Sequence, residues 1–145
     1  CAVRVKTQEG QITDVMDIRK PVGIEMKYEV LKPGYMLMVY CSVFNEEGLR
    51  IFASIENDPG WRGRPRKPGR YVSTAWIPGN LLSEGKLFVS ASIRTLDPDV
   101  RRFRVNDAVA FQVVDNLEGD SARGDYMGDM SGVVRPLLKW ETQFR

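Results

Sequence analysis

The chain has 145 residues, of which 43% are hydrophobic and 28% charged, as expected for one globular domain with a core of its own. A net charge of +2 argues against nucleic-acid binding, which needs a clustered basic face. The lack of histidine excludes Ser-His-Asp and Cys-His catalysis and histidine-based zinc sites, and no phosphate-binding loop motif occurs. We therefore expect no cofactor, no metal and no catalytic residues.

Apolar and polar residues alternate in short runs along the chain, and this pattern predicts strands. In chain order the predicted strands are 3–6, 24–30, 35–44, 49–55, 71–77, 86–95 and 108–114, followed by a last apolar stretch at 133–140. Polar segments rich in Gly, Pro, Asn and Asp separate them at 32–34, 45–48, 57–69, 78–80, 97–99 and 116–132. Seven or eight strands at this spacing predict one all-β domain, an immunoglobulin-like antiparallel β-sandwich, with a jelly roll as the alternative.

The alternation also predicts which side chains face outward. If Val39 and Cys41 face the core, Tyr40 faces outward, and the same reasoning turns Trp76 and Phe88 outward on two further strands. Aromatic rings stack on sugar rings, while hydroxyl and guanidinium groups bond sugar hydroxyls. The candidate carbohydrate-binding residues are Tyr40, Ser42, Trp61, Thr74, Trp76, Phe88, Ser90 and Arg94. The alternative is that these aromatic residues form a dimer interface or lie under the long loops.

Other residues give weaker indications. Cys41 lies in an apolar run and is expected to be a buried free thiol, although a disulfide with Cys1 is open. The basic run Arg62–Arg70 is interrupted by Pro and Gly and is expected to be a solvated loop, with an anion contact as the alternative. Acidic residues of the loops could supply the carboxylate pair of a glycoside hydrolase or ligands for calcium, but loop acids are usually solvated or cap turns. These acids are Asp97, Asp99, Asp107, Asp115, Asp120, Asp125 and Asp129, of which Asp107 and Asp115 are expected to bracket the strand 108–114.

Several short segments together carry a family resemblance. They are Pro68-Gly69-Arg70-Tyr71, Trp76-Ile77-Pro78, Gly85-Lys86-Leu87-Phe88-Val89, the run Asp107–Asp115, Arg123-Gly124-Asp125-Tyr126 and the run Gly132–Trp140. In this order and spacing, over Val3–Trp140, the chain resembles the C-terminal domain of Wzt-type proteins, the ATP-binding subunits of ABC transporters that export O-antigen and related polysaccharides.

The resemblance implies an immunoglobulin-like sandwich, here residues 1–145, that follows an ATPase domain in a longer subunit. It implies that the domain binds an exported polysaccharide, often by a terminal structure, and is not itself an enzyme. The implied partners are the glycan, the ATPase domain and the membrane subunit of the transporter. The resemblance also implies a homodimer that exchanges C-terminal strands, for which 133–140 is the expected segment. The implied location is cytoplasmic, at the inner face of the bacterial inner membrane.

Overall fold

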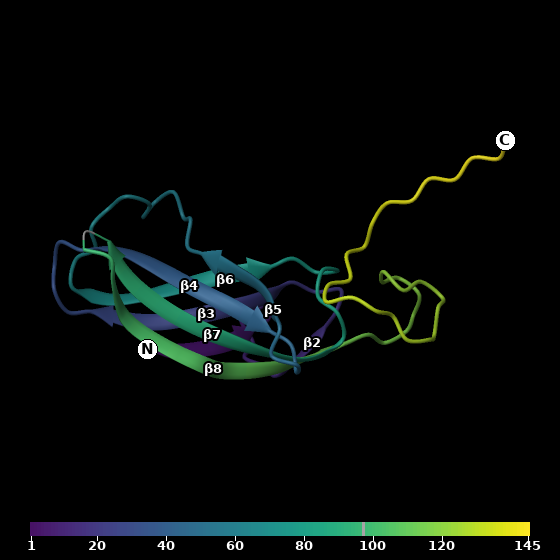
Figure 1. The fold of residues 1–145 in the computed structure, drawn as a ribbon, viewed down its shortest axis with the longest axis horizontal. Helices are drawn as coiled ribbons and strands as arrows, with labels where there is room; N and C mark the ends of the chain where they lie inside the picture. The colour runs from purple at the N-terminus through teal and green to yellow at the C-terminus, as the bar shows by residue number, and fades with distance from the viewer. Residues whose placement is uncertain (97) are drawn as a thin grey trace.

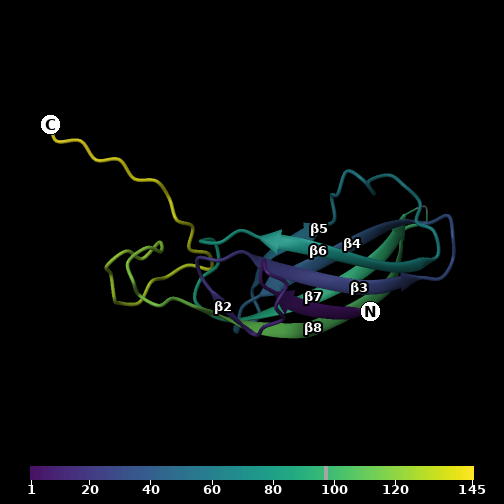
Figure 2. The same ribbon diagram turned by 180° about the vertical axis from the view of Figure 1, so that it is seen from behind.

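The domain consists of two β-sheets packed face to face (Figures 1 and 2). The computed structural model describes residues 1–96 and 98–145, and these residues contain eight strands and no helix. The three-stranded sheet has the order β1-β3-β6, with β1 at Ala2–Lys6, β3 at Val22–Val30 and β6 at Gly69–Ile77. The five-stranded sheet has the order β2-β8-β7-β4-β5, with bounds Val15–Asp17, Val100–Val114, Gly85–Leu96, Met36–Phe44 and Arg50–Ile55. The predicted β-sandwich is confirmed.

The core fills the space between the two sheets, and alternate residues of each strand supply it. Val39 and Val43 of β4 are buried, as are Val89 of β7 and Ile24 of β3, so the predicted inward faces are confirmed. A fully buried side chain of this size contributes roughly 1.5–3 kcal/mol relative to an exposed one. The neighbours of these residues in sequence therefore project from the outer faces of the sandwich.

One long side of the sandwich is closed and the other is open. β1 lies beside β8 on the closed side, which is the lower side in Figure 1. On the upper side β5 and β6 are the edge strands of their sheets and do not pair with each other. A cleft therefore opens between these two edges.

The last sheet strand is longer than predicted. β8 begins at Val100 instead of Ala108. It contains a bulge, in which the three residues 106–108 of β8 lie opposite the single residue Ser90 of β7. Asp107 adopts a left-handed conformation there (φ 49°), and its backbone N–H donates to Ser90 Oγ at 3.1 Å. The expectation that Asp107 precedes the strand is wrong, because this bulge lets the strand pass through a residue that usually marks a turn. In the predicted break at 97–99, Asp97 lies outside the described residues, whereas Pro98 and Asp99 form a turn.

Two further strand features differ from expectation. β2 was not predicted, because its three residues are too few to show a period. It runs parallel to β8, so the five-stranded sheet is mixed instead of purely antiparallel. In β3 the expected wet face is interrupted by Glu25, which is buried and accepts a hydrogen bond from Lys6 Nζ at 2.8 Å.

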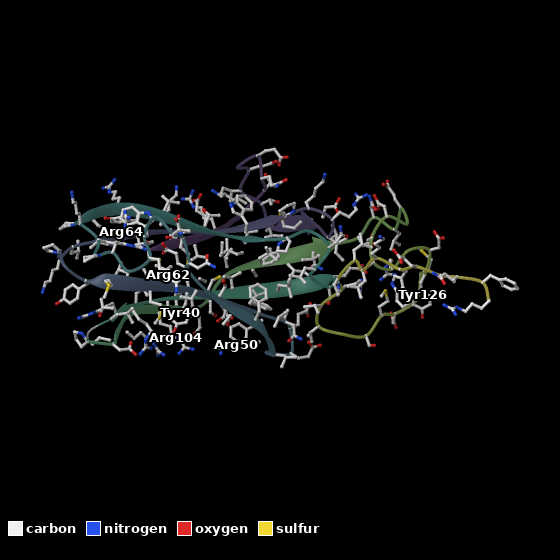
Figure 3. The ribbon with its side chains drawn as sticks, turned by 90° about the horizontal axis from the view of Figure 1, so that it is seen from above. Tyr40, Arg50, Arg62, Arg64, Arg104 and Tyr126 are labelled. Carbon is white, nitrogen blue, oxygen red and sulfur yellow. The ribbon has the colours of Figure 1, made fainter. Side chains whose placement is uncertain are left out.

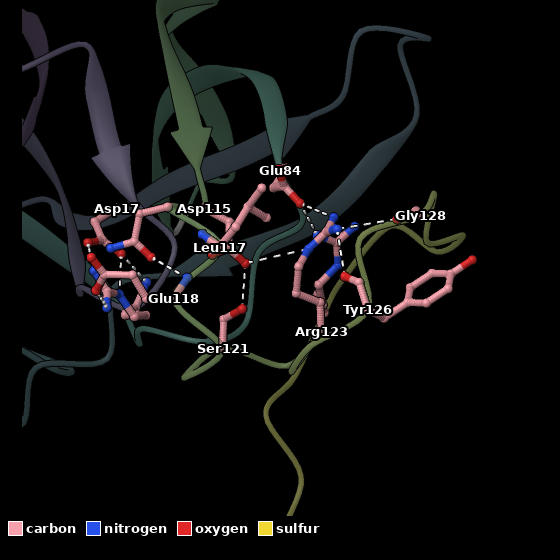
Figure 4. Close-up of polar contacts among 12 residues, drawn as sticks. Asp17, Glu84, Asp115, Leu117, Glu118, Ser121, Arg123, Tyr126 and Gly128 are labelled. Carbon is pink, nitrogen blue, oxygen red and sulfur yellow. Dashed lines mark hydrogen bonds and ion pairs between the residues drawn. The ribbon is translucent and has the colours of Figure 1, made fainter.

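The segment after β8 is a long loop, as predicted, but an ionic network ties it to the sandwich (Figure 4). Arg123 contacts Glu84 and lies 3.7 Å from Asp115, and Arg135 donates to Glu84 at 2.5 Å. Burial raises the pKa of Asp115, but the hydrogen bond from Ser121, a backbone N–H and the two arginine charges outweigh it and leave that pKa below its ordinary value. The network fixes the start of the C-terminal segment.

The apolar stretch 133–140 forms no strand within this chain. Val134 makes a single bridge to Leu82, and the backbone N–H of Leu137 donates to Asn80 at 3.1 Å. Beyond this point the chain extends away from the sandwich (Figures 1 and 2), and Trp140 and Phe144 are 85% and 104% exposed. The tail therefore presents apolar side chains that the described residues do not cover.

Candidate functional site

The eight candidate residues fall on two separate surfaces of the sandwich. Tyr40 and Ser42 on β4, with Phe88, Ser90 and Arg94 on β7, line hollows on the outer face of the five-stranded sheet. Thr74 and Trp76 on β6 and Trp61 in the loop 57–68 line the cleft between the sheet edges. Tyr40 and Phe88 therefore share one surface, and Trp76 lies on the other. Alternation along a strand fixes whether a side chain faces inward or outward, but not which sheet the strand joins.

We call the first surface the sheet-face groove. It consists of two adjoining hollows of about 180 and 470 Å³, which share Phe44, Ser90 and Arg104. Most of the large side chains in it are aromatic, hydroxyl or guanidinium groups from β4, β5, β7 and β8. The groove residues are Tyr40, Ser42, Phe44, Arg50, Phe88, Ser90, Ser92, Arg94, Arg101 and Arg104. Figure 3 shows Tyr40, Arg50 and Arg104 along the same side of the molecule.

Strand register arranges these side chains in rows across the sheet. Tyr40 lies opposite Ser92, and Ser92 lies opposite Arg104 on the next strand. In the following row Ser42 is paired with Ser90. In the third row Phe44 lies opposite Phe88, an aromatic cross-strand pair of the kind that stabilises antiparallel sheets. The register therefore brings a hydroxyl row between two rows that contain aromatic rings.

Guanidinium groups surround this arrangement. The Arg50 guanidinium lies 5.3 Å from the centre of the Phe44 ring. Arg94 Nε donates to Asp99 Oδ1 at 2.8 Å, and this hydrogen bond raises the pKa of Arg94. Arg104 Nε donates to the Asn106 side chain at 2.9 Å. In the part of the chain that the structure describes, no Asp or Glu lines the hollow around Tyr40, whereas Glu46 and Asp107 line its neighbour.

The cleft between β5 and β6 is the second candidate surface, with a volume of about 500 Å³. Trp61 and Trp76 are 41% and 48% exposed on its rim. The Trp76 ring rests against Gly23 on the neighbouring strand, since a Cβ atom at Gly23 would come within 2.8 Å of that ring. Lys6 Nζ lies 5.7 Å from the centre of the same ring. Glycine thus gives Trp76 a flat support.

One end of the cleft is closed by Arg66, whose side chain turns inward from an otherwise exposed basic loop. Arg66 is 3% exposed, its Nη2 donates to Glu56 Oε1 at 2.6 Å, and it also bonds the Tyr28 hydroxyl. Its guanidinium lies 5.4 Å from the Trp61 ring and 5.5 Å from the Tyr71 ring. The expected solvated loop is thus correct for Arg62 and Arg64 (Figure 3), but Arg66 serves as the anchor of the loop.

Five residues of the sheet-face groove are not among the candidates predicted from the sequence, namely Phe44, Arg50, Ser92, Arg101 and Arg104. The alternation along 35–44 and 86–95 also turns Phe44 and Ser92 outward, whereas the run 49–55 shows no regular alternation that assigns a face to Arg50. Arg101 and Arg104 precede the expected start of the strand at Ala108, so they were not assigned a face. The alternation of Arg102, Phe103, Arg104 and Val105 is the signal that could have identified this half of β8 as a strand.

Three of the loop acids contact arginines. Asp120 accepts a hydrogen bond from Arg19 at 2.6 Å, Asp99 accepts one from Arg94 at 2.8 Å, and Asp115 lies 3.7 Å from Arg123 Nε in an ion pair. Within residues 1–96 and 98–145, no three His, Cys, Asp or Glu side chains gather as a metal site.

Cys41 is buried and free, as predicted, and Cys1 is exposed and free. Across the same ranges no helix is long and apolar enough to cross a membrane.

Comparisons with known proteins agree with the fold. No protein-family model and no curated protein sequence matches the chain. Among solved structures, the crystal structure of the C-terminal domain of Wzt is similar, with a TM-score of 0.73 and 13% sequence identity. The similarity covers 98% of this chain and 81% of that chain. At this identity the comparison establishes a shared β-sandwich fold.

Proposed function

We propose that the domain is a non-catalytic carbohydrate-binding module that recognises an exported cell-surface polysaccharide for an ABC transporter. The observation that carries the proposal is the sheet-face groove, in which Tyr40, Phe44 and Phe88 flank a row of serine hydroxyls. Exposed aromatic rings provide flat apolar contacts for the C–H faces of sugars. Hydroxyl and guanidinium groups beside them supply the hydrogen bonds that orient the ring.

The geometry favours weak and selective binding over tight capture. The side chains stand on paired strands, so little ordering is needed when a sugar binds. The groove lies on the outer face of one sheet, so we expect it to cover one face of a sugar ring. We expect dissociation constants between about 1 μM and 1 mM, which correspond to roughly 4–8 kcal/mol.

The fold-level similarity to the Wzt domain supports the part of the proposal that places this domain in a polysaccharide exporter. The ligand is then an O-antigen-like glycan, bound through its terminal structure, and the domain is one part of a transport ATPase subunit. The ATPase domain and the membrane subunit are its protein partners. The place of action is the cytoplasmic face of the bacterial inner membrane.

The test separates the two candidate surfaces. Polysaccharide from the surface of the source bacterium, with and without its end modification, is titrated into ¹⁵N-labelled domain. Tyr40→Ala and Phe88→Ala should each weaken binding by about tenfold or more, because each removes one stacking surface. Trp61→Ala is the matched control in the cleft and should bind normally. The proposal fails if the Tyr40 and Phe88 variants bind normally, and loss only in Trp61→Ala would move the site to the cleft.

A second candidate function is dimerisation, and the exposed tail favours it. Leu138, Trp140 and Phe144 project apolar side chains that the described part of the chain leaves uncovered. Large exposed apolar groups of this kind often mark a protein interface. The exchange of this segment between two copies is the proposed arrangement. A chain that ends at Leu137 keeps the Asn80 contact and should be monomeric by light scattering, whereas the full chain should be a dimer.

A further inference from the structure

The sheet-face groove carries more positive charge than a neutral sugar requires. Arg50, Arg94, Arg101 and Arg104 all line the hollow around Tyr40. Among the described residues, Arg94 is the one of these four that forms a salt bridge, with Asp99 at 2.8 Å. The other three arginines therefore bring charges to the hollow that no described carboxylate neutralises.

The register of the strands makes this charge costly for the fold. Arg94 on β7 lies directly opposite Arg101 on β8. Like charges directly opposite each other on neighbouring strands destabilise a sheet, by an amount on the scale of roughly 0.2–1 kcal/mol for cross-strand pairs. The bulge beside Ile93 and Arg94 keeps Arg101 aligned with Arg94 and leaves Arg104 opposite Ser92. The salt bridge from Arg94 to Asp99 offsets part of this repulsion, but Arg101 has no ion-pair partner among the described residues.

On the outer face of the other sheet, two lysines share one carboxylate. There Lys6 Nζ lies 2.8 Å from Glu25, and Lys27 Nζ lies 3.6 Å from the same carboxylate. The hydrogen bond from Lys6 lowers the pKa of Glu25, so this carboxylate stays ionised. The cleft is balanced too, because Glu56 pairs with Arg66. By contrast, Arg50, Arg101 and Arg104 line the hollow around Tyr40 without an ion pair among the described residues.

We infer that the groove binds an anionic sugar, with a carboxylate or phosphate group held by Arg101 and Arg104 and the sugar ring against Tyr40. Arginine suits this role because its planar guanidinium forms paired hydrogen bonds with carboxylate and phosphate oxygens. Ser92, which lies between Tyr40 and Arg104 in register, is placed to bond a ring hydroxyl. This inference rests on the proposed glycan binding at the groove and adds the charge class of the ligand.

The experiment compares matched acidic and neutral sugars on the full chain. The probes are trigalacturonate against galactotriose for the carboxylate, and mannose 6-phosphate against mannose for the phosphate. Binding is followed by ¹⁵N NMR in about 25 mM and about 300 mM NaCl, since salt screens charge contacts. At least one acidic probe should bind about tenfold or more tightly than its neutral partner, and more weakly at the higher salt concentration. Comparison of the trigalacturonate and mannose 6-phosphate results then shows whether the groove prefers a carboxylate or a phosphate group.

Variants assign the effect to the groove. Arg101→Gln with Arg104→Gln should remove the preference for the acidic sugar, whereas Arg62→Gln with Arg64→Gln changes the same formal charge on the exposed loop and should keep it. Equal binding of acidic and neutral sugars at Tyr40 would overturn this inference and leave the proposed function standing. If no probe changes the NMR signals near Tyr40, the result would count against both the anionic-sugar inference and the proposed glycan binding. If the sugars fail but phosphatidylglycerol vesicles bind in an Arg101- and Arg104-dependent manner, the groove is a membrane contact and the inference is wrong.

Discussion

Replacing Arg66 with methionine should destabilise the domain by about 2–4 kcal/mol, although Arg66 belongs to a loop rather than to a strand. The side chain is 3% exposed, donates to Glu56 at 2.6 Å and bonds the Tyr28 hydroxyl. Methionine keeps most of the packing volume against Trp61 but leaves the Glu56 carboxylate with only the hydrogen bond from Ser73 and no positive partner. The loop 57–68 should then detach from the cleft.

The magnitude follows from the burial of the two partners. Removing one member of a buried ion pair typically costs about 3–5 kcal/mol, because the remaining charge stays buried and unpaired. The Glu56 side chain is 16% exposed and keeps some access to water, which lowers the expected cost. The lost hydrogen bond to Tyr28 adds about 1 kcal/mol.

Urea unfolding followed by circular dichroism measures the effect. With a denaturant slope of about 2 kcal/mol per M, the midpoint should fall by about 1–2 M. The control Arg64→Met replaces an exposed arginine of the same loop and should change stability by less than about 0.5 kcal/mol. Adding Glu56→Gln to Arg66→Met should restore part of the loss, because no unpaired carboxylate then remains. Equal midpoints for the Arg66 and Arg64 variants would refute the anchoring role of Arg66.

Three further predictions concern residues that support the fold outside the sheet-face groove. The pKa of Asp115 is lower in the folded state than in the unfolded state. The contribution of Asp115 to stability is therefore complete above about pH 5 and is lost as the pH falls below about 4. In thermal melts, Asp115→Asn should reduce this loss of stability at acid pH. Gly79→Ala should cost about 3 kcal/mol in urea unfolding, because the new Cβ would lie 2.1 Å from the Arg19 carbonyl oxygen. Gly23→Ala should cost only about 1 kcal/mol but displace the half-exposed Trp76 ring, which tryptophan fluorescence will report.

Each of these predictions has a control. Asp125→Asn removes a carboxylate that is exposed and should leave the acid dependence unchanged. Gly60→Ala lies in an exposed loop, where the new Cβ would meet only the Asp58 side chain at 3.2 Å, and should unfold near the wild-type midpoint. For Gly23→Ala, the Trp76→Phe background should abolish the fluorescence change. A variant that behaves like its control would contradict the corresponding contact.

The sequence by itself determined which side chains of an alternating strand face the core and which face outward. Side chains alternate across a strand as a matter of local geometry, so the inward faces of β4, β6 and β7 could be assigned from the periodicity alone. Turn-forming residues marked most of the loops for the same local reason. Local rules failed at Asp107, where a turn-type residue lies inside β8, because its backbone conformation is supported by a hydrogen bond to Ser90 on the neighbouring strand.

Only the tertiary structure decided which outward residues share a surface. Tyr40 and Trp76 look equivalent in sequence, yet β4 and β6 belong to different sheets, so the two rings lie on separate surfaces. Arg94 and Arg101 are brought opposite each other by pairing between β7 and β8, which no local pattern encodes. The choice of neighbouring strand is set by burial and loop closure over the whole chain. For that reason the sequence pointed to Tyr40, Phe88 and Arg94 as outward candidates, while only the fold brought Arg50, Arg101 and Arg104 beside them.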